Sequence, residues 1–230
     1  MAFQPIIDIE RQAIWGYEAL VRGAEGQPAG YVLDQVDEES QYKFDQSCRV
    51  KAIELAGRLI PRGSDARLSI NFMPNAVYEP SACIRTSLET ARRVGFDMGR
   101  IMFEFTENER MVSTSHVARI VAEYKRLGFI TAIDDFGAGH AGLNLLANFQ
   151  TDLIKIDMEI VRGIAGSEPR RAIVAGIMVI AKALGITVLA EGVETEEEAA
   201  TLRQAGITLL QGYLFARPAV ESLPPVTFVA

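Results

Sequence analysis

Short apolar runs alternate along this chain with longer segments in which apolar residues recur every three or four positions. The short runs are rich in β-branched and aromatic residues, and several are apolar on both faces, which favours strands of a parallel sheet covered by helices. We expect strands at residues 3–9, 14–21, 68–72, 101–105, 130–134, 153–157, 187–190 and 209–215.

The longer segments predict amphipathic helices between the strands. One has apolar residues at 117, 120, 121, 124 and 127 before Gly128, and another has them at 173, 177, 180, 181 and 184 before Gly185. This spacing places apolar side chains on one helix face, and a glycine suits the turn that ends the helix. Thr195 and Glu198 have the spacing of a capping box, which predicts the start of a helix that ends at Gly206.

The order of these elements predicts a barrel. Only a few residues join the first two predicted strands, too few for a helical crossover, so we expect them to pair antiparallel as a hairpin. Residues 23–30 predict a flexible loop, and the remaining strands and helices alternate. The sequence therefore predicts an α/β fold, a modified (β/α)₈ TIM-type barrel with an antiparallel first strand, formed by residues 1–230 as a single domain.

Composition narrows the classes of protein that fit. The chain of 230 residues is 49% hydrophobic with a net charge of −7, which suits one globular domain and disfavours binding to DNA, to RNA duplexes or to anionic membranes. No apolar run reaches about 18 residues and no basic-then-apolar leader opens the chain, so we expect neither membrane insertion nor a signal peptide. Cys48 and Cys83 lack metal-ligand spacing and fit reduced thiols. We therefore expect a cytoplasmic protein.

Most of the predicted strands have a polar residue at or near the same end. These residues are Glu18, Asn71, Glu104, Asp134, Asp135, Lys155, Asp157, Glu191 and Gln211. A salt bridge or a helix cap would account for any one of them, but not for seven successive strands. In barrels of this type the carboxyl ends of the strands form the face where reactions occur.

The adjacent carboxylates of Asp134 and Asp135 indicate what binds there. They repel each other and are costly to desolvate, so a cation is expected against them. Oxygen ligands without histidine or cysteine select Mg²⁺ or Mn²⁺ over Zn²⁺. A pair of metal ions about 3.5–4 Å apart, with one carboxylate bridging them, is suited to in-line displacement at phosphorus.

Eight short segments, in this order, extend the pattern over nearly the whole chain. They are Phe3-Gln4-Pro5-Ile6, Glu18-Ala19-Leu20-Val21-Arg22, Ser69-Ile70-Asn71, Glu104-Phe105-Thr106-Glu107, Asp134-Asp135-Phe136-Gly137, Lys155-Ile156-Asp157, Glu191-Gly192-Val193-Glu194 and Gln211-Gly212-Tyr213. Together they resemble the motifs of the EAL domain, the family of cyclic diguanylate (c-di-GMP) phosphodiesterases. The three letters Glu-Ala-Leu alone would carry no weight, but the ordered set does.

The resemblance implies a role for each matching residue. Two Mg²⁺ or Mn²⁺ ions would be bound by Glu18, Asn71, Glu104, Asp134 and Asp135. Lys155 would orient or help to activate the attacking water, Glu191 would be a general base or a further metal contact, and Glu107 would brace the loop after the aspartate pair. The implied substrate-binding residues are Gln4, Leu20, Arg22, Asp157, Glu194 and Gln211.

The implied reaction is hydrolysis of c-di-GMP to linear pGpG by water activated by two metal ions. A homodimer and a sensory or regulatory domain outside this chain are the implied partners. Residues 137–142 are smaller than the common family pattern, which would loosen this loop, and Gly23 replaces a frequent tryptophan. The shortened 23–39 segment and residues 44–51 resemble the EAL domains attached to BLUF blue-light sensors. The alternatives are a weak or inactive EAL domain acting as a c-di-GMP receptor or protein-interaction module, or a barrel that cleaves another phosphodiester.

Overall fold

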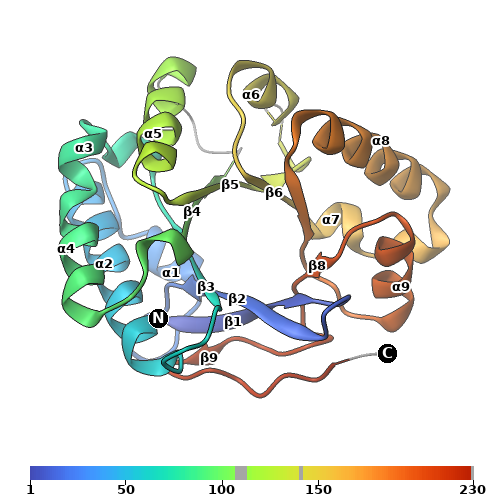
Figure 1. Ribbon diagram of the computed structural model, residues 1–230, viewed down its shortest axis with the longest axis horizontal. Helices are drawn as coiled ribbons and strands as arrows, with labels where there is room; N and C mark the ends of the chain where they lie inside the picture. Colours follow the sequence, from blue (N-terminus) through green and yellow to red (C-terminus); the bar gives the residue numbers. More distant parts are fainter. Residues whose placement is uncertain (107–112, 140–141, 229–230) are drawn as a thin grey trace.

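A computed structural model gives the fold, and it describes residues 1–106, 113–139 and 142–228. Strands form a closed ring with helices on most of its outside and β9 beside β1 (Figure 1). The strands are β1 Ala2–Asp8, β2 Ala13–Leu20, β3 Arg67–Asn71, β4 Ile101–Thr106, β5 Ile130–Phe136, β6 Leu153–Ile156, β7 Thr187–Ala190, β8 Leu209–Leu210 and β9 Ala219–Val220.

The ring closes through its first strand. Strands β2 to β8 are parallel neighbours in sequence order. β1 runs antiparallel between β2 and β8, and its first residues also pair with β9. The predicted TIM-type barrel with an antiparallel first strand is therefore confirmed. Because β1 runs in the opposite direction, its beginning lies at the carboxyl ends of the other strands, where Gln4 pairs with Glu18.

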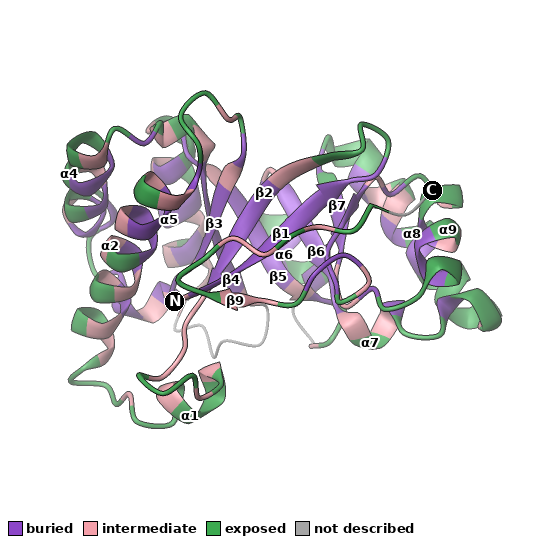
Figure 2. Ribbon diagram, turned by 90° about the horizontal axis from the view of Figure 1, so that it is seen from below, coloured by how far each residue is buried: buried purple, intermediate pink, exposed green. Residues whose placement is uncertain are grey.

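Helices pack against most of the barrel and present their outer sides to solvent, whereas β1 and β2 are crossed only by the chain around β9 on the side seen in Figure 2. They are α1 Ala29–Leu33, α2 Gln41–Leu59, α3 Pro80–Cys83, α4 Arg85–Val94, α5 Thr114–Arg126, α6 Gly142–Asn148, α7 Met158–Val161, α8 Glu168–Leu184 and α9 Glu196–Gln204, with short 3₁₀ turns at Pro74–Ala76, Met98–Arg100 and Ile164–Gly166. α1 begins inside the segment expected to be a loop, and none of its residues is buried. No helix in the described ranges is long and apolar enough to cross a membrane.

The helix predictions hold best where periodicity and end signals agree. On α5, Val117, Ile120, Val121 and Tyr124 are buried, as the spacing predicts. Before α9, the side chain of Thr195 accepts a hydrogen bond from the backbone N–H of Glu198, and the Glu198 side chain completes the capping box.

The predicted buried face of α8 is partly wrong. Val174, Ile177 and Ala181 form the buried stripe, whereas Ile173 is 50% exposed and Leu184 41%. The outer side of this helix also has apolar residues, so periodicity alone admits two adjacent faces. Packing against the barrel selects the one centred on Ile177.

The last predicted strand is shorter than expected. β8 ends at Leu210, and residues 213–215 form a turn instead of continuing it to 215. The reason lies at Gly212, whose backbone packs so closely on Val193 that a Cβ would collide with the Val193 carbonyl oxygen. The chain bends there onto the loop after β7, and the two-residue β9 takes the remaining place beside β1.

A buried polar contact fixes the end of β3. On α2, the Asp45 carboxylate accepts a hydrogen bond of 2.9 Å from the backbone N–H of Met73 and lies 2.6 Å from the Arg49 guanidinium. Arg49 also donates to the Tyr124 hydroxyl over 2.7 Å. A buried ion pair is costly to break once formed. These contacts therefore tie α2 and α5 to the residues that directly follow Asn71.

Candidate active site

The site is built by side-chain alternation inside the barrel. One layer of the interior is apolar and consists of Ile6, Met102, Ala132, Leu153, Leu189 and Leu209. Successive side chains on a strand point to opposite faces, so residues two positions apart point the same way. Each apolar residue is therefore followed, two positions nearer the carboxyl face, by a candidate site residue, and these are Gln4, Glu104, Asp134, Lys155, Glu191 and Gln211.

Lys155 lies at the centre of this polar layer and is fully buried. Its ammonium nitrogen is 2.7 Å from a carboxylate oxygen of Glu191 and 2.9 Å from one of Asp134. Oxygens of Glu104 and Glu18 follow at 3.3 and 3.6 Å. Four carboxylates around one ammonium leave a large excess of negative charge, which calls for protons or metal ions.

Amide and hydroxyl donors hold the carboxylates in place. Asn71 donates 3.0 Å hydrogen bonds from its side-chain nitrogen to both Glu18 and Glu104. Ser69 donates to the second oxygen of Glu104 over 2.5 Å. Gln211 donates to Glu18 over 2.7 Å and to Gln4 over 3.3 Å. The orientations of Glu18 and Glu104 are thus set before any ligand binds.

The aspartate pair depends on an irregular strand. In a regular strand the side chains of Asp134 and Asp135 would point to opposite faces. The pairing of β5 with β6 shifts register between Ile133 and Phe136, and Asp135 has a left-handed backbone with φ of 54°. Such a conformation costs about 1–3 kcal/mol outside glycine. It allows both carboxylates to line the same cavity.

Burial and charge shift the pKa values within this layer. Burial would lower the pKa of Lys155, but Asp134, Glu104, Glu18 and Glu191 more than offset it, so the pKa lies well above its usual value. Burial raises the pKa values of Glu104 and Glu191 well above the usual range, despite the opposing charge of Lys155. For Glu18, the charge of Lys155 and three hydrogen bonds outweigh burial and lower the pKa.

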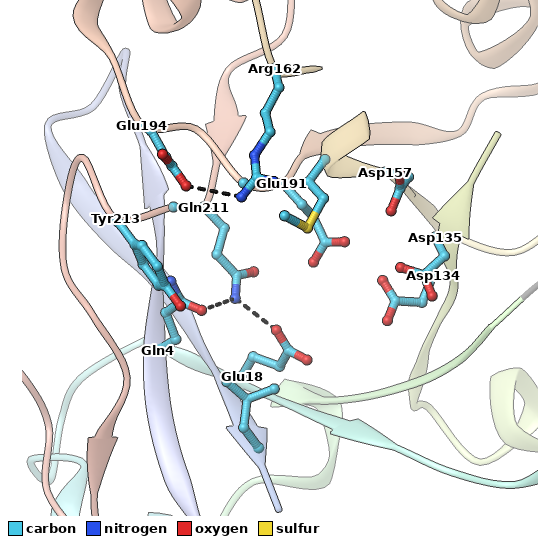
Figure 3. Close-up of a pocket in the computed structure, with 14 residues that line it drawn as sticks. Gln4, Glu18, Asp134, Asp135, Asp157, Arg162, Glu191, Glu194, Gln211 and Tyr213 are labelled. Carbon is cyan, nitrogen blue, oxygen red and sulfur yellow. Dashed lines mark hydrogen bonds and ion pairs between the residues drawn. The ribbon is translucent and has the colours of Figure 1, made fainter. Parts of the chain in front are cut away.

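A cavity of about 250 Å³ opens above the carboxylates (Figure 3). Of the predicted residues, Gln4, Glu18, Leu20, Asp134, Asp135, Asp157, Glu191, Glu194 and Gln211 line it. Asp157 also caps α7 by accepting a 2.8 Å hydrogen bond from the backbone N–H of Glu159. A second and larger cavity of about 840 Å³, lined mainly by apolar residues of β2, β3, α1 and α2, shares Glu18, Leu20 and Asp134 with the first.

Two predicted residues do not join this group in the described structure. Arg22 lines neither cavity, and its guanidinium donates to the carbonyl oxygen of Val21 over 2.7 Å. Glu107 lies outside the described residues, as do positions 140 and 141 of the 137–142 loop. The roles expected for Arg22 and Glu107 stay predictions.

Sequence reasoning gave no role to Arg162, Met158 or Tyr213, which also line the smaller cavity. Tyr213 belongs to a quoted motif, and its position two residues after Gln211 on the same strand-end segment was the available signal. Met158 is the first residue of α7 and Arg162 directly follows this helix. Neither had a comparable signal in the sequence.

The donor set fits divalent metal ions. Carboxylate oxygens of Glu18, Glu104 and Asp134 lie within 4.8 Å of one another, and so do those of Asp134, Asp135 and Glu191. Asp134 belongs to both groups. The side-chain amide oxygen of Gln211, Oε1, is buried with no hydrogen-bond partner in the structure. A hard, all-oxygen donor set of this kind suits Mg²⁺ or Mn²⁺.

The metal-free protein should lose stability as the pH rises through the range in which Asp135 ionises. Burial and the charges of Asp134 and Asp157 raise the pKa of Asp135 to about 6. Unfolded aspartate titrates at about 3.9, so this group's contribution to stability is complete below that pH and is lost as the pH rises through its folded pKa. In chelator, we expect the thermal midpoint to decrease as the pH rises from about 4 to about 6, between the unfolded and the folded pKa of Asp135. Asp135→Asn should flatten this part of the profile, and an equally steep profile in the variant would contradict the prediction.

Comparison with known proteins identifies the family. The sequence profile described as the EAL domain matches residues 1–218. The chain belongs to the EAL-domain family. Among curated relatives of this EAL domain, the blue light- and temperature-regulated antirepressor BluF of Escherichia coli is 34% identical over 227 residues, covering 99% of this chain and 56% of BluF. The predicted similarity to EAL domains of blue-light sensors is therefore confirmed.

A second curated relative is the cyclic di-GMP phosphodiesterase PA2567 of Pseudomonas aeruginosa, 30% identical over 224 residues, which cover 95% of this EAL domain and 38% of PA2567. This EAL domain thus spans about half the length of BluF, and less of PA2567.

Two solved structures share the fold closely. A standalone EAL protein from Vibrio cholerae O395 in its c-di-GMP-bound form has a TM-score of 0.94 and 52% identity, covering 99% of this chain and 94% of that one. Klebsiella pneumoniae BlrP1, in a manganese and c-di-GMP complex, has a TM-score of 0.90 and 36% identity, covering 98% of this chain and 57% of that one.

Proposed function

We propose that this EAL domain is a metal-dependent phosphodiesterase that hydrolyses c-di-GMP to linear pGpG. The observation that carries the proposal is the oriented set of carboxylates around Lys155, in which Asp134 belongs to two groups able to hold a metal ion. The names of relatives that bind or cleave c-di-GMP support the substrate.

The residues divide between two ions, either Mg²⁺ or Mn²⁺. Glu18, Asn71, Glu104 and Asp134 would hold one ion, and Asp134 with Asp135 would hold the other. When bound, the ions neutralise the phosphodiester and make water a better nucleophile near neutral pH.

The protein's own groups complete the chemistry. Lys155 contributes fixed positive charge where negative charge develops on the phosphate, and burial strengthens this effect. Glu191 accepts the proton that the attacking water loses, or else adds a metal ligand. Burial raises its pKa, and a higher pKa makes the carboxylate a stronger base toward that proton. Gln211 positions Gln4 and Glu18 at the substrate.

The two cavities suit a ligand with two arms. They lie on either side of shared residues, among them Glu18, Leu20 and Asp134. A cyclic dinucleotide has two bases joined through two phosphates, so a phosphate at the carboxylates would direct its bases to opposite sides. Asp157 and Glu194 line one side, and Arg22 would approach a phosphate after leaving its contact with Val21.

The setting of the enzyme is part of the same proposal. We place a single EAL domain in the cytoplasm, forming a homodimer and regulated by a sensory domain that this chain does not include. The similarity to BluF, named as regulated by blue light, supports a sensory input.

A second candidate is a protein-interaction module or c-di-GMP receptor without turnover. It is favoured by the name of BluF, an antirepressor. The complete set of predicted metal ligands in the described structure favours the enzyme.

Chromatography of c-di-GMP incubated with the purified protein tests the proposal. With Mg²⁺ or Mn²⁺ we expect pGpG to accumulate, because the carboxylates need a cation before they can accept an anionic phosphate. Chelator should abolish the product. Intact c-di-GMP under every condition, together with binding seen by calorimetry, would establish the receptor instead.

A further inference from the structure

Arg162 is the cationic residue among the described residues that line the smaller cavity. Six carboxylates line the same cavity, those of Glu18, Asp134, Asp135, Asp157, Glu191 and Glu194. Lys155 is fully buried and is not part of this lining. A positive charge that faces the cavity therefore needs a reason to be there.

The guanidinium of Arg162 pairs with Glu194, with 3.1 Å between a terminal nitrogen of the arginine and a carboxylate oxygen. The two side chains come from neighbouring segments, one directly after α7 and the other between β7 and α9, and Figure 3 shows them at the same side of the cavity. They are 51% and 44% exposed. An exposed ion pair of this kind contributes little to stability, so ligand binding can rearrange it.

The backbone on both sides of this pair is held rigidly. Glu198 is buried, and one of its carboxylate oxygens accepts a 2.7 Å hydrogen bond from the backbone N–H of Gly163, the residue after Arg162. The other oxygen accepts a 2.9 Å bond from the backbone N–H of Glu194 itself. One carboxylate thus fixes the spacing of the two side chains, which remain free to adjust their ends.

We propose that Arg162 acts with Glu194, which the family resemblance already implies as a substrate-binding residue, to recognise a guanine base of the substrate, an inference that rests on the proposed function. The guanidinium donates two hydrogen bonds to the O6 and N7 acceptors of guanine, the commonest specific pairing of arginine with a base. The adjacent carboxylate accepts hydrogen bonds from the N1–H and the 2-amino group. Two donors beside two acceptors complement guanine, whereas adenine has a donor in place of O6 and lacks the N1 proton.

A phosphate group fits this pair less well than a base. Glu194 would face an anion at close range once Arg162 turned to it, and Asp157 and Glu191 line the same cavity. A neutral base that uses both members of the pair leaves neither charge without a partner.

The wall beside the pair offers a surface for stacking. The ring of Tyr213 lines the same cavity, and the Arg217 guanidinium lies 4.1 Å from its centroid. Bases commonly stack on aromatic rings. Tyr213 and the Arg162–Glu194 pair would then contact the face and the edges of one base.

Kinetics with altered bases test the inference. Arg162→Gln should raise KM for c-di-GMP by about 10-fold to 100-fold, the range of a lost bidentate contact to a base. kcat should change less than about threefold, since Arg162 does not touch the reacting atoms. The 7-deazaguanine analogue, which lacks N7, should bind the wild-type protein more weakly than c-di-GMP does. Arg162→Gln should bind the analogue and c-di-GMP with equal affinity. The preference for c-di-GMP over c-di-AMP should shrink in the variant.

Arg93→Gln is the matched control, because Arg93 and Glu54 form a similar exposed ion pair with 2.8 Å between nitrogen and oxygen. Neither residue lines either cavity. Its KM and base preference should equal those of the wild-type protein. The same comparisons of affinity, made by calorimetry with Ca²⁺, the ion named in a c-di-GMP complex of BlrP1, measure binding separately from KM.

The outcomes separate the two proposals. If the wild-type protein releases pGpG but Arg162→Gln keeps its KM and its preference for guanine, the base-recognition proposal fails and the phosphodiesterase stands. If Arg162→Gln weakens c-di-GMP and c-di-AMP equally, Arg162 binds a part common to both nucleotides and the proposal also fails. If no pGpG forms but calorimetry shows the N7-dependent difference, base recognition stands and the enzyme proposal fails.

Discussion

The Asp134→Asn variant is expected to lose about a thousandfold or more in kcat/KM for c-di-GMP, a loss of roughly 4 kcal/mol in transition-state stabilisation. Asp134 is the residue common to both described groups of carboxylates that could hold a metal ion, so this change of one atom weakens both. The amide retains the shape of the carboxylate but not its charge. Kinetics at saturating Mn²⁺ and calorimetric titration with Mn²⁺ alone measure the two consequences.

Asp152→Asn is the matched control for Asp134→Asn. Asp152 directly precedes β6, at the opposite end of the barrel, where it accepts hydrogen bonds from Thr131 and pairs with Lys125. We expect its activity and Mn²⁺ affinity to stay within about threefold of wild type, as for a site without substrate contact. Equal Mn²⁺ affinity in Asp134→Asn and wild type would show that Asp134 is not a metal ligand.

Lys155→Met is expected to reduce kcat by about 10²-fold to 10⁴-fold, because it removes the buried positive charge from the site of phosphate attack. It should also destabilise the metal-free protein by about 3–5 kcal/mol, the usual cost of leaving buried charges unpaired. Methionine retains most of the side-chain volume, so the loss reports charge rather than packing. Mn²⁺ should restore much of the stability, since it supplies the missing positive charge.

Thermal unfolding in chelator and in Mn²⁺ distinguishes a charge effect from simple misfolding. The control is Lys182→Met, which changes an exposed lysine on α8 and should leave both midpoints unchanged. If Lys155→Met were destabilised equally with and without Mn²⁺, the ammonium would serve packing rather than charge balance.

The carboxyl face of the barrel was predictable because its pattern is short-range. Residues two positions apart on a strand point to the same face, so each residue of the apolar layer has a polar neighbour two positions along its strand. Lys155 thus follows Leu153, and Glu191 follows Leu189. The antiparallel pairing of the first strand was predictable because the turn between the first two strands is too short for a helical crossover. Both inferences need only a few neighbouring residues.

What the sequence could not supply depends on long-range contacts. β8 stops early because Gly212 packs on the backbone of Val193, and nothing near Gly212 in the sequence encodes that neighbour. The left-handed backbone of Asp135 likewise depends on how β5 pairs with β6. Arg162 enters the cavity through the course of the chain after α7, and its partner Glu194 is 32 residues away.

The position of β1 has a consequence for the order in which the protein becomes functional during synthesis. Gln4 reaches its partner Gln211 across 207 residues, and β1 closes the ring only by pairing with β8 and β9. Contacts so distant in sequence form late in folding, after their loop entropy has been overcome. A nascent chain on the ribosome therefore has the carboxylates that we propose as metal ligands long before it has a closed cavity beside them. Under the proposed function, the ability to bind the nucleotide would arise in one step, when the last strands emerge and dock beside the first.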